Sequence, residues 1–291
     1  MRQTIVYGLI SGSTYALIAL GFALVYSVVR FFNFAHGAVF SAGAYLNYCC
    51  FVIFRLPFWL SASIAVVLAA LLGVSFEFLV FKRIRKRGGN SLVLLIASLG
   101  LLISVQNIIA MVFGNDIRSV HSGLVEEGIS LFGARVTFIQ SNILLTSLLL
   151  VLVTAAILRW TKIGTALRAV ANDPELAATK GIPSQKVIYL TYLLGSALAA
   201  VAGIMVSLDV SMDPTMGFDA LLYGIVAVIA GGLGSVPGAY LGGLLLGLSQ
   251  NLGVWKIPSQ WKDAIAFAVM ILFLLFRPQG MFGKRVFKAH V

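Results

Sequence analysis

Charged residues are scarce in this sequence of 291 residues, because Asp, Glu, Lys and Arg together make up only 11%. A soluble globular domain carries roughly 25% charged residues, so this chain lacks the surface that water requires. Instead, 60% of its residues are hydrophobic and its mean hydropathy is +1.00. The composition therefore excludes a soluble domain and indicates a membrane protein.

Side chains that commonly carry chemistry are also few. The only two cysteines, Cys49 and Cys50, are neighbours inside an apolar run, and we expect small packing residues rather than a disulfide or a metal site. The three histidines, His36, His121 and His290, are too scattered to predict a metal site. Walker-type phosphate loops and G-x-S-x-G elbows are absent. We therefore expect no enzyme activity, metal or cofactor in this chain.

Long apolar runs, in contrast, recur from one end of the chain to the other. A membrane-spanning helix needs about 20 apolar residues, and continuous rather than alternating runs exclude a transmembrane β-barrel. We predict an all-α, polytopic transmembrane helical bundle of about eight or nine spans, forming one domain over residues 1–291. The predicted spans are 4–28, 34–54, 58–81, 91–113, 140–158, 187–208, 219–232, 236–254 and 264–276.

Fourteen of the twenty-one Lys and Arg residues lie in three segments: KRIRKR at 82–87, the loop 159–186 and the tail after Phe276. Basic residues in short loops beside apolar spans determine topology and favour the cytoplasmic side, so we expect no nucleic-acid partner. The loops 114–139 and 209–213 carry acidic residues and fit the other side. We predict an N-terminus outside, a C-terminus in the cytoplasm, and spans surrounded by membrane lipid.

The segment 219–254 allows two interpretations. Its first half is short for a span, and AGGLGSVPGAYLGG forms either a tight cytoplasmic turn between two spans or a re-entrant hairpin. Both interpretations leave the C-terminus in the cytoplasm.

Small residues recur every four positions in several predicted spans. Such ladders let helix backbones approach closely within a bilayer, although glycine is also simply common in membrane helices. Four ladders in one chain favour a compact bundle of tightly crossing helices. The glycines assigned to helix packing are Gly8, Gly12, Gly37, Gly195, Gly203, Gly231, Gly232, Gly234, Gly238 and Gly242.

Ionisable residues are nearly absent from the spans. Glu77, five residues before Lys82, is the clearest exception, and it is either a structural acid near the interface or part of a pathway. The spans contain neither a carboxylate or histidine relay for protons nor an arginine ladder for voltage. Energy for uphill transport would therefore enter from outside the chain, although sodium coupling through backbone carbonyls stays open.

The loop 159–186 is too long for a simple turn and carries helix signals of its own. Asn172 or Asp173 can cap a short helix that has Pro174 in its first turn, and Gly181 can end it. Such a helix is suited to receive movement from a peripheral motor. The alternative is an amphipathic helix that rests on the lipid.

The sequence ELAATKG at 175–181 resembles the EAA loop of ABC importer permeases, with Leu176 where that pattern has alanine. The segments 8–45, 168–182 and 229–248 resemble the LivH-type permeases of branched-chain amino acid ABC transporters, in the same order. The resemblance covers nearly the whole chain. It implies coupling to an ATPase through Asp173, Glu175, Ala177, Ala178 and Gly181.

The resemblance also implies the partners and the location. The chain would pair with a second permease, LivM-like or a copy of itself, with two ATP-binding subunits and with a periplasmic or lipid-anchored binding protein. It would import branched-chain or related neutral amino acids through a bacterial or archaeal cytoplasmic (inner) membrane. The alternatives are a self-sufficient channel for urea or another small neutral solute and, third, a membrane-embedded enzyme.

One polar motif, RFFNFAHG at 30–37, interrupts the apolar sequence. Asn33 can cap the next helix, His36 can hydrogen-bond to a neighbouring helix, and Gly37 can let that neighbour approach. The motif is therefore a structural clamp or an element of a cytoplasmic gate.

A second polar segment, DPTMGFD at 213–219, lies on the predicted outer side, and it either contacts the binding protein, helps close an outer gate or forms a capped turn. The candidates for the pathway or gate, each of which could instead join helices, are Ser11, Ser13, Thr14, Asn33, His36, Gln106 and Asn107.

Overall fold

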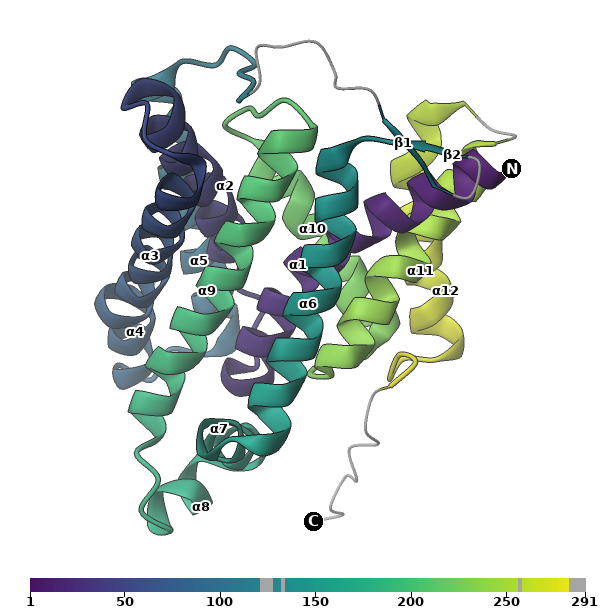
Figure 1. Cartoon of the computed structure of the whole chain (residues 1–291). Coiled ribbons are helices and arrows are strands. Elements are labelled where there is room, and N and C mark those ends of the chain that lie inside the picture. The colour runs from purple at the N-terminus through teal and green to yellow at the C-terminus, as the bar shows by residue number, and fades with distance from the viewer. Residues whose placement is uncertain (121–127, 132–133, 256–257, 283–291) are drawn as a thin grey trace.

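The computed structural model describes residues 1–120, 128–131, 134–255 and 258–282, and these residues form a helical bundle (Figure 1). The predicted all-α fold class is confirmed. The first half contains α1 (Arg2–Val29), α2 (Ala35–Tyr48), the π-helix η1 (Cys49–Ile53), α3 (Phe58–Phe76), the π-helix η2 (Glu77–Phe81), α4 (Lys82–Lys86) and α5 (Ser91–Phe113). The second half contains α6 (Phe138–Trp160), α7 (Lys162–Asn172), α8 (Pro174–Thr179), α9 (Ser184–Asp209), α10 (Met216–Gly231), α11 (Val236–Val254), the 3-10 helix η3 (Ser259–Trp261) and α12 (Lys262–Phe276).

Within the described residues, seven helical segments are long and apolar enough to cross a membrane, and each corresponds to a predicted span. They are α1, α2 with η1, α3 to α4, α5, α6, α9 and η3 with α12. The helices α10 and α11 meet the same criterion only as a pair, which bends by 114°.

The α10–α11 pair is a hairpin rather than a straight span. The four-residue break that contains Gly232 and Gly234 lies near Ser27 at the end of α1. Gly231 of α10 and Gly238 of α11 pack so closely that a side chain on either would meet the other's backbone. The glycine-rich sequence therefore forms a tight turn between two helices that diverge from it.

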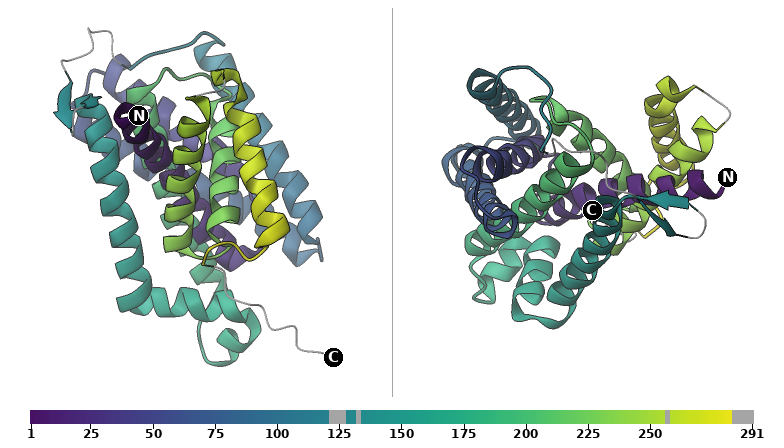
Figure 2. Two further views of the ribbon diagram at one scale, coloured as in Figure 1. Left: turned by 90° about the vertical axis from the view of Figure 1, so that its right-hand side faces the viewer. Right: turned by 45° about the horizontal axis from the view of Figure 1, so that its top comes forward.

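The helix α1 lies at the centre of the bundle, between α9, α10 and α11 (Figures 1 and 2). In their most apolar stretches, 78% of the residues of α1 are buried, against 22% in α5 and α6 and 6% in η3 with α12. Outer helices can leave apolar side chains exposed because lipid solvates those side chains.

The small-residue ladders lie where helices cross most closely. Gly8 and Gly12 of α1 face Gly243 and Gly247 of α11, and a Cβ atom on Gly12 would lie 2.7 Å from Cα of Leu244. The ladder on α9 faces other partners: Gly195 packs against Gly21 and Val25 of α1, and Gly203 against the carbonyl of Phe40 in α2. Backbones therefore approach within van der Waals distance because no side chain separates them.

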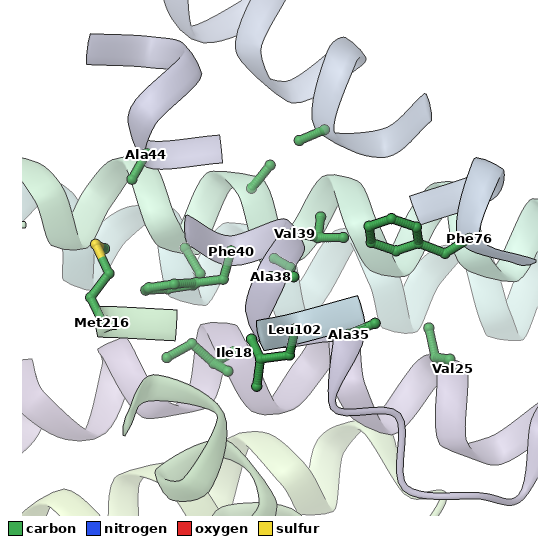
Figure 3. Packing of buried hydrophobic residues seen from close by; sticks show 14 of the residues in the cluster. Ile18, Val25, Ala35, Ala38, Val39, Phe40, Ala44, Phe76, Leu102 and Met216 are labelled. Carbon is green, nitrogen blue, oxygen red and sulfur yellow. The ribbon is translucent and has the colours of Figure 1, made fainter. Parts of the chain in front are cut away.

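A cluster of buried apolar side chains surrounds α2 (Figure 3). Phe40 and Val39 of α2 pack in the same cluster as Ile18 of α1, Phe76 of α3 and Met216 at the start of α10. This packing joins α2 to most of the surrounding helices and holds it in a fixed position beside α1.

The bundle has two distinct ends. At the basic end, defined here by α4, α7, α8 and residues 277–282, lie the predicted basic segments 82–87 and 159–186 and the described start of the tail (Figure 1). The tail residues Lys284, Arg285 and Lys288 lie outside the described residues.

The opposite end contains the N-terminus and the α5–α6 and α9–α10 connections (Figure 1). A small antiparallel hairpin there, β1 (Ile129–Leu131) and β2 (Ala134–Val136), is bound to α1 by two hydrogen bonds of 2.9 and 3.0 Å between the Gln3 side chain and the Arg135 backbone. A backbone bridge between Arg118 and Met212 joins the two connections. Residues His121, Glu126 and Glu127 lie outside the described part, as does His290 in the tail.

Candidate functional site

A cavity of about 360 Å³ lies at the opposite end of the bundle, between α1, α9 and α10. Two pathway candidates from α1, Ser11 and Thr14, line it. The carboxylates of Asp209, Asp213 and Asp219 also line it, and its lining residues include no lysine or arginine. The cavity therefore combines apolar walls with hydroxyl groups and negative charge, which favours a ligand that carries an amino group. Its lining residues are Ile10, Ser11, Thr14, Tyr15, Ile18, Val206, Asp209, Val210, Ser211, Asp213, Met216, Asp219, Ala220 and Tyr223.

Local hydrogen bonds hold the rim of the cavity. Oδ1 of Asp213 accepts hydrogen bonds from the amide and the hydroxyl of Thr215, at 2.7 and 2.5 Å, and so closes a turn directly before α10, while residues 216–219 of the segment 213–219 form the first turn of α10. The hydroxyl of Tyr223 donates to Asp263 at the start of α12, and the Tyr223 ring lies 4.8 Å from the ring of Tyr15 in α1. These contacts connect α1, α10 and α12 beside the cavity.

The remaining pathway candidates on α1 and α5 do not line this cavity. Ser13 is completely buried, and within the described residues its hydroxyl has no hydrogen-bond partner. Asn107 is exposed on α5 and donates to the carbonyl of Ile103 at 2.7 Å. Gln106 lies beside it and is half-buried. The structure thus separates Gln106 and Asn107 from Ser11 and Thr14.

Asn33 and His36 lie in the short connection from α1 to α2 and in the first turn of α2. Asn33 is 4% exposed, and its Oδ1 accepts a hydrogen bond of 3.2 Å from the amide of Ala35. The amide of Phe34 donates to Oγ of Ser98 in α5 at 3.0 Å. Asn33 therefore organises the start of α2, while Ser98 attaches the same turn to α5.

His36 faces α1, where it is almost completely buried. Its ring packs edge-on against the ring of Phe22, with 6.1 Å between the ring centroids. Nε2 of His36 has no partner among the described residues and lies against Gly21. Gly37 instead packs on Gly217 of α10. The motif therefore joins α2 to α1 on one side and to α10 on the other.

The short helix α8 projects from the basic end (Figure 1). Asp173, rather than Asn172, caps it: Oδ1 accepts hydrogen bonds from the amides of Glu175 and Leu176, at 2.9 and 3.0 Å. Pro174 occupies the first turn, and Gly181 follows the helix with a φ of 82°, a conformation that favours glycine.

Residues of α8 divide into a buried and an exposed set. Ala177 is buried against α7 and α9, whereas Glu175 and Ala178 are exposed and Leu176 is 57% exposed. Leu176, which stands where the EAA-loop pattern has alanine, therefore lies on the exposed surface of α8.

Sequence reasoning missed α7, the helix that precedes α8. Thr161 caps it by accepting a hydrogen bond of 3.0 Å from the amide of Gly164. Its buried residues, Leu167 and Val170, pack with Val28 of α1 and with Ala177. A capping threonine and apolar residues three positions apart were the available signal. We refer to α7 and α8 together as the coupling unit.

Glu77 lies on the contact between η2 and α9, remote from the cavity lining. It is completely buried and forms an ion pair with Arg85 of α4. Nε2 of Gln185 donates to Oε1 of Glu77 at 3.1 Å, and Nζ of Lys82 donates to the hydroxyl of Tyr189 at 2.9 Å. This polar group holds the first turns of α9 against η2 and α4.

Cys49 and Cys50 are unpaired, and the part of the chain that the structure describes contains no group of three His, Cys, Asp or Glu residues that could hold a metal ion.

A family model described as branched-chain amino acid transport system / permease component matches residues 4–274. The BraD permease of the high-affinity branched-chain amino acid transport system of Pseudomonas aeruginosa is 34% identical over 97% of this chain and 95% of its own length. LivH of Escherichia coli K12 gives the same values. A probable LivH permease of Methanocaldococcus jannaschii is 30% identical over 92% of this chain and 88% of its own length.

Among solved structures, PsaBC from Streptococcus pneumoniae in complex with Fab matches with a TM-score of 0.51 and 14% sequence identity. The match covers 94% of this chain and 91% of that chain. At this identity the likeness supports the helical fold alone.

Proposed function

Since the chain belongs to the family of branched-chain amino acid transport permeases, we propose that it is the membrane-spanning subunit of an ATP-driven importer for branched-chain or related neutral amino acids. An external binding protein delivers the solute. A second permease, LivM-like or a second copy, completes the membrane part, and two separate subunits bind and hydrolyse ATP.

The observation that carries the proposal is the coupling unit. The cap at Asp173, the buried Ala177 and the glycine at position 181 hold α8 as a rigid helix outside the bundle. Its exposed Glu175, Leu176 and Ala178 offer a surface that the other described residues do not cover. A channel that works alone would have no use for such a helix, so the family's transport mechanism explains it better.

The proposed orientation follows from charge. Because α4 and α7 carry six basic residues, and Lys180 and Lys186 follow α8 at the same end, we infer that this end faces the cytoplasm. The cavity then opens toward the outside, where the binding protein releases its solute. The N-terminus lies outside and the tail is cytoplasmic, in a bacterial or archaeal inner membrane.

The cavity suits the proposed solute class. Its apolar residues can contact an aliphatic side chain, and the carboxylates of Asp209, Asp213 and Asp219 can attract the α-ammonium group. A volume of about 360 Å³ is within the ordinary range for sites that bind small molecules.

The proposal is tested by reconstituting the chain in liposomes with its second permease, the ATPase subunits and the binding protein. Uptake of labelled leucine is expected only when ATP is present on the ATPase side. Uptake by the chain alone, driven by an ion gradient, would overturn the proposal and favour a self-sufficient carrier.

Topology is tested separately with cysteines introduced at positions 175 and 178, after Cys49 and Cys50 are replaced by serine. An impermeant thiol reagent should label these cysteines only from the cytoplasmic side. Labelling from outside intact cells would contradict the proposed orientation.

A further inference from the structure

Arg30 ends α1 in a conformation that side chains rarely adopt. Its φ and ψ are 53° and 32°, in the left-handed region, and its amide donates to the carbonyl of Tyr26 at 3.0 Å. Among the described residues, Arg55 is the only other non-glycine residue with a positive φ. Glycine is the usual residue at such helix ends, so an arginine here has a cost that its side chain can offset.

The Arg30 side chain reaches the coupling unit. Nη2 donates to the carbonyl of Ala171 at 2.5 Å and to the carbonyl of Asn172 at 3.3 Å. These are the last carbonyls of α7, which have no partner within their own helix, and a positive charge is favourable at a helix C-terminus. One guanidinium group therefore donates hydrogen bonds to both of these carbonyls at the C-terminal end of α7.

The two carbonyls lie directly before the corner between α7 and α8. The next residue, Asp173, caps α8, so Arg30 holds the coupling unit at its corner. An apolar contact lies beside it, in which Val28 of α1 packs with Leu167 and Val170 of α7, and Ala177 of α8 and Val187 of α9 belong to the same cluster. Arg30 adds directional hydrogen bonds to this apolar contact.

From Arg30 two routes lead to the rest of the bundle. Toward the N-terminus, α1 continues without a break to Ile18 and Thr14, which line the cavity. Toward the C-terminus, His36 follows within six residues and packs α2 against Gly21 and Phe22 of α1. The α7–α8 corner is therefore connected through Arg30 to α1, which lines the cavity, and to α2, which follows α1 in the chain.

We propose that Arg30 is the positioning residue that couples the α7–α8 corner to α1, so that the ATPase moves α1 when it moves α8. The inference rests on the proposed function. It concerns this chain's own hydrogen bonds between α1 and α7, whereas the proposed function concerns the solute and the partners.

The test compares Arg30→Gly with Arg55→Gly in the reconstituted transporter. Glycine accepts a positive φ, so both variants keep the backbone and remove only the side chain. Arg55 lies between η1 and α3 at the opposite end, is exposed, and within the described residues its side chain forms no hydrogen bond. It is therefore a matched control.

The measured quantity is the number of solute molecules imported per ATP hydrolysed. For Arg30→Gly we expect this ratio to fall by about tenfold, because charge-assisted hydrogen bonds are lost, while ATP hydrolysis continues. For Arg55→Gly we expect the wild-type ratio. A wild-type ratio in Arg30→Gly, or an equal loss in Arg55→Gly, would overturn the proposed role of Arg30.

If Arg30→Gly does not assemble with its partners, Arg30→Lys decides. The lysine ammonium keeps the positive charge but lacks the planar guanidinium group that donates to both carbonyls. An intermediate ratio of imported solute to hydrolysed ATP would therefore support the proposed role of Arg30, and a wild-type ratio would overturn it. If the wild-type chain imports solute without an ATPase, the proposed function and the proposed role of Arg30 are both overturned. If the wild-type complex needs ATP but Arg30→Gly imports as much solute per ATP as the wild type, only the proposed role of Arg30 is overturned.

Discussion

Gln185 donates a hydrogen bond of 3.1 Å to Oε1 of Glu77 and so joins the first turn of α9 to the π-helix η2. The same carboxylate pairs with Arg85, and α9 begins only a few residues after α8 ends. Arg30 of α1 therefore binds the end of α7, and this polar group binds the start of α9, the helix that follows α8. Both attachments predict measurable effects.

Replacing Glu77 by alanine should destabilise the protein by about 2 kcal/mol, because Arg85 and Gln185 lose a buried, charged acceptor. This value lies below the ~3–5 kcal/mol that removal of one partner of a fully buried ion pair costs, because Arg85 is 28% exposed and keeps some water. Unfolding in mixed micelles with increasing SDS measures the change. Glu175→Ala, at an exposed position of α8, is the control, and equal losses in both variants would contradict a special role for Glu77.

Gly12→Ala should destabilise the bundle by about 1–3 kcal/mol, because the added Cβ would overlap the backbone of α11. The overlap is with Cα of Leu244 at 2.7 Å and with the carbonyl of Gly243 at 3.0 Å, which cannot rotate away. Thermal unfolding in detergent measures the change. Gly100→Ala on α5, where a Cβ meets nothing within 4 Å, should leave the transition unchanged or raise it slightly.

Thr14→Trp should fill the cavity and abolish solute uptake while the assembled complex continues to hydrolyse ATP, because the indole would occupy space between α1 and α10. Uptake and ATP hydrolysis in proteoliposomes provide the two measurements. Ser104→Trp, on the exposed face of α5, is expected to transport normally. Normal uptake by Thr14→Trp would show that the solute passes elsewhere.

Leu176→Asp should weaken binding of the ATPase subunits by at least about tenfold, because a charge would replace an exposed apolar side chain at the proposed contact. Co-purification at graded ATPase concentrations measures this affinity. Leu233→Asp is a matched control, because Leu233 is a 39% exposed leucine in the α10–α11 turn at the same end. The α8 contact is contradicted if both substitutions weaken binding equally.

His36→Ala should reduce transport more than His36→Gln, because glutamine fills part of the buried space beside Gly21 and Phe22 of α1 whereas alanine leaves a gap between α2 and α1. Initial rates of uptake, normalised to the amount of assembled complex, measure the difference. Normal transport by both variants would exclude a clamp and a gate at this position.

Much of the fold could be predicted because its signals are local. A run of about 20 apolar residues predicts a span wherever it occurs, and every predicted span coincides with helices of the structure. The helix capped near position 173 was predicted for the same reason, since a cap and the amides that it binds lie within three residues.

The sequence could not show which candidate site residues line a cavity, because the same polar residue on an apolar helix can line a cavity, pack against another helix or face lipid. Ser11, Ser13 and Thr14 are neighbours on α1, yet Ser11 and Thr14 line the cavity and Ser13 is buried beside it. Gln106 and Asn107 show the same ambiguity, because an amide on an apolar helix can face a pathway or simply bond to its own helix.

The sequence by itself determined the membrane environment, the helices and the end of the molecule at which positive charge gathers, because composition and short-range spacing decide these properties. The tertiary structure decided which glycine ladder faces which, that Glu77 pairs with Arg85, and that Arg30 reaches Ala171 across 141 residues of chain. The residues of these contacts come from different helices, and the sequence alone allows several pairings of those helices. The packing of the folded chain, where helix backbones approach closely, selects one pairing.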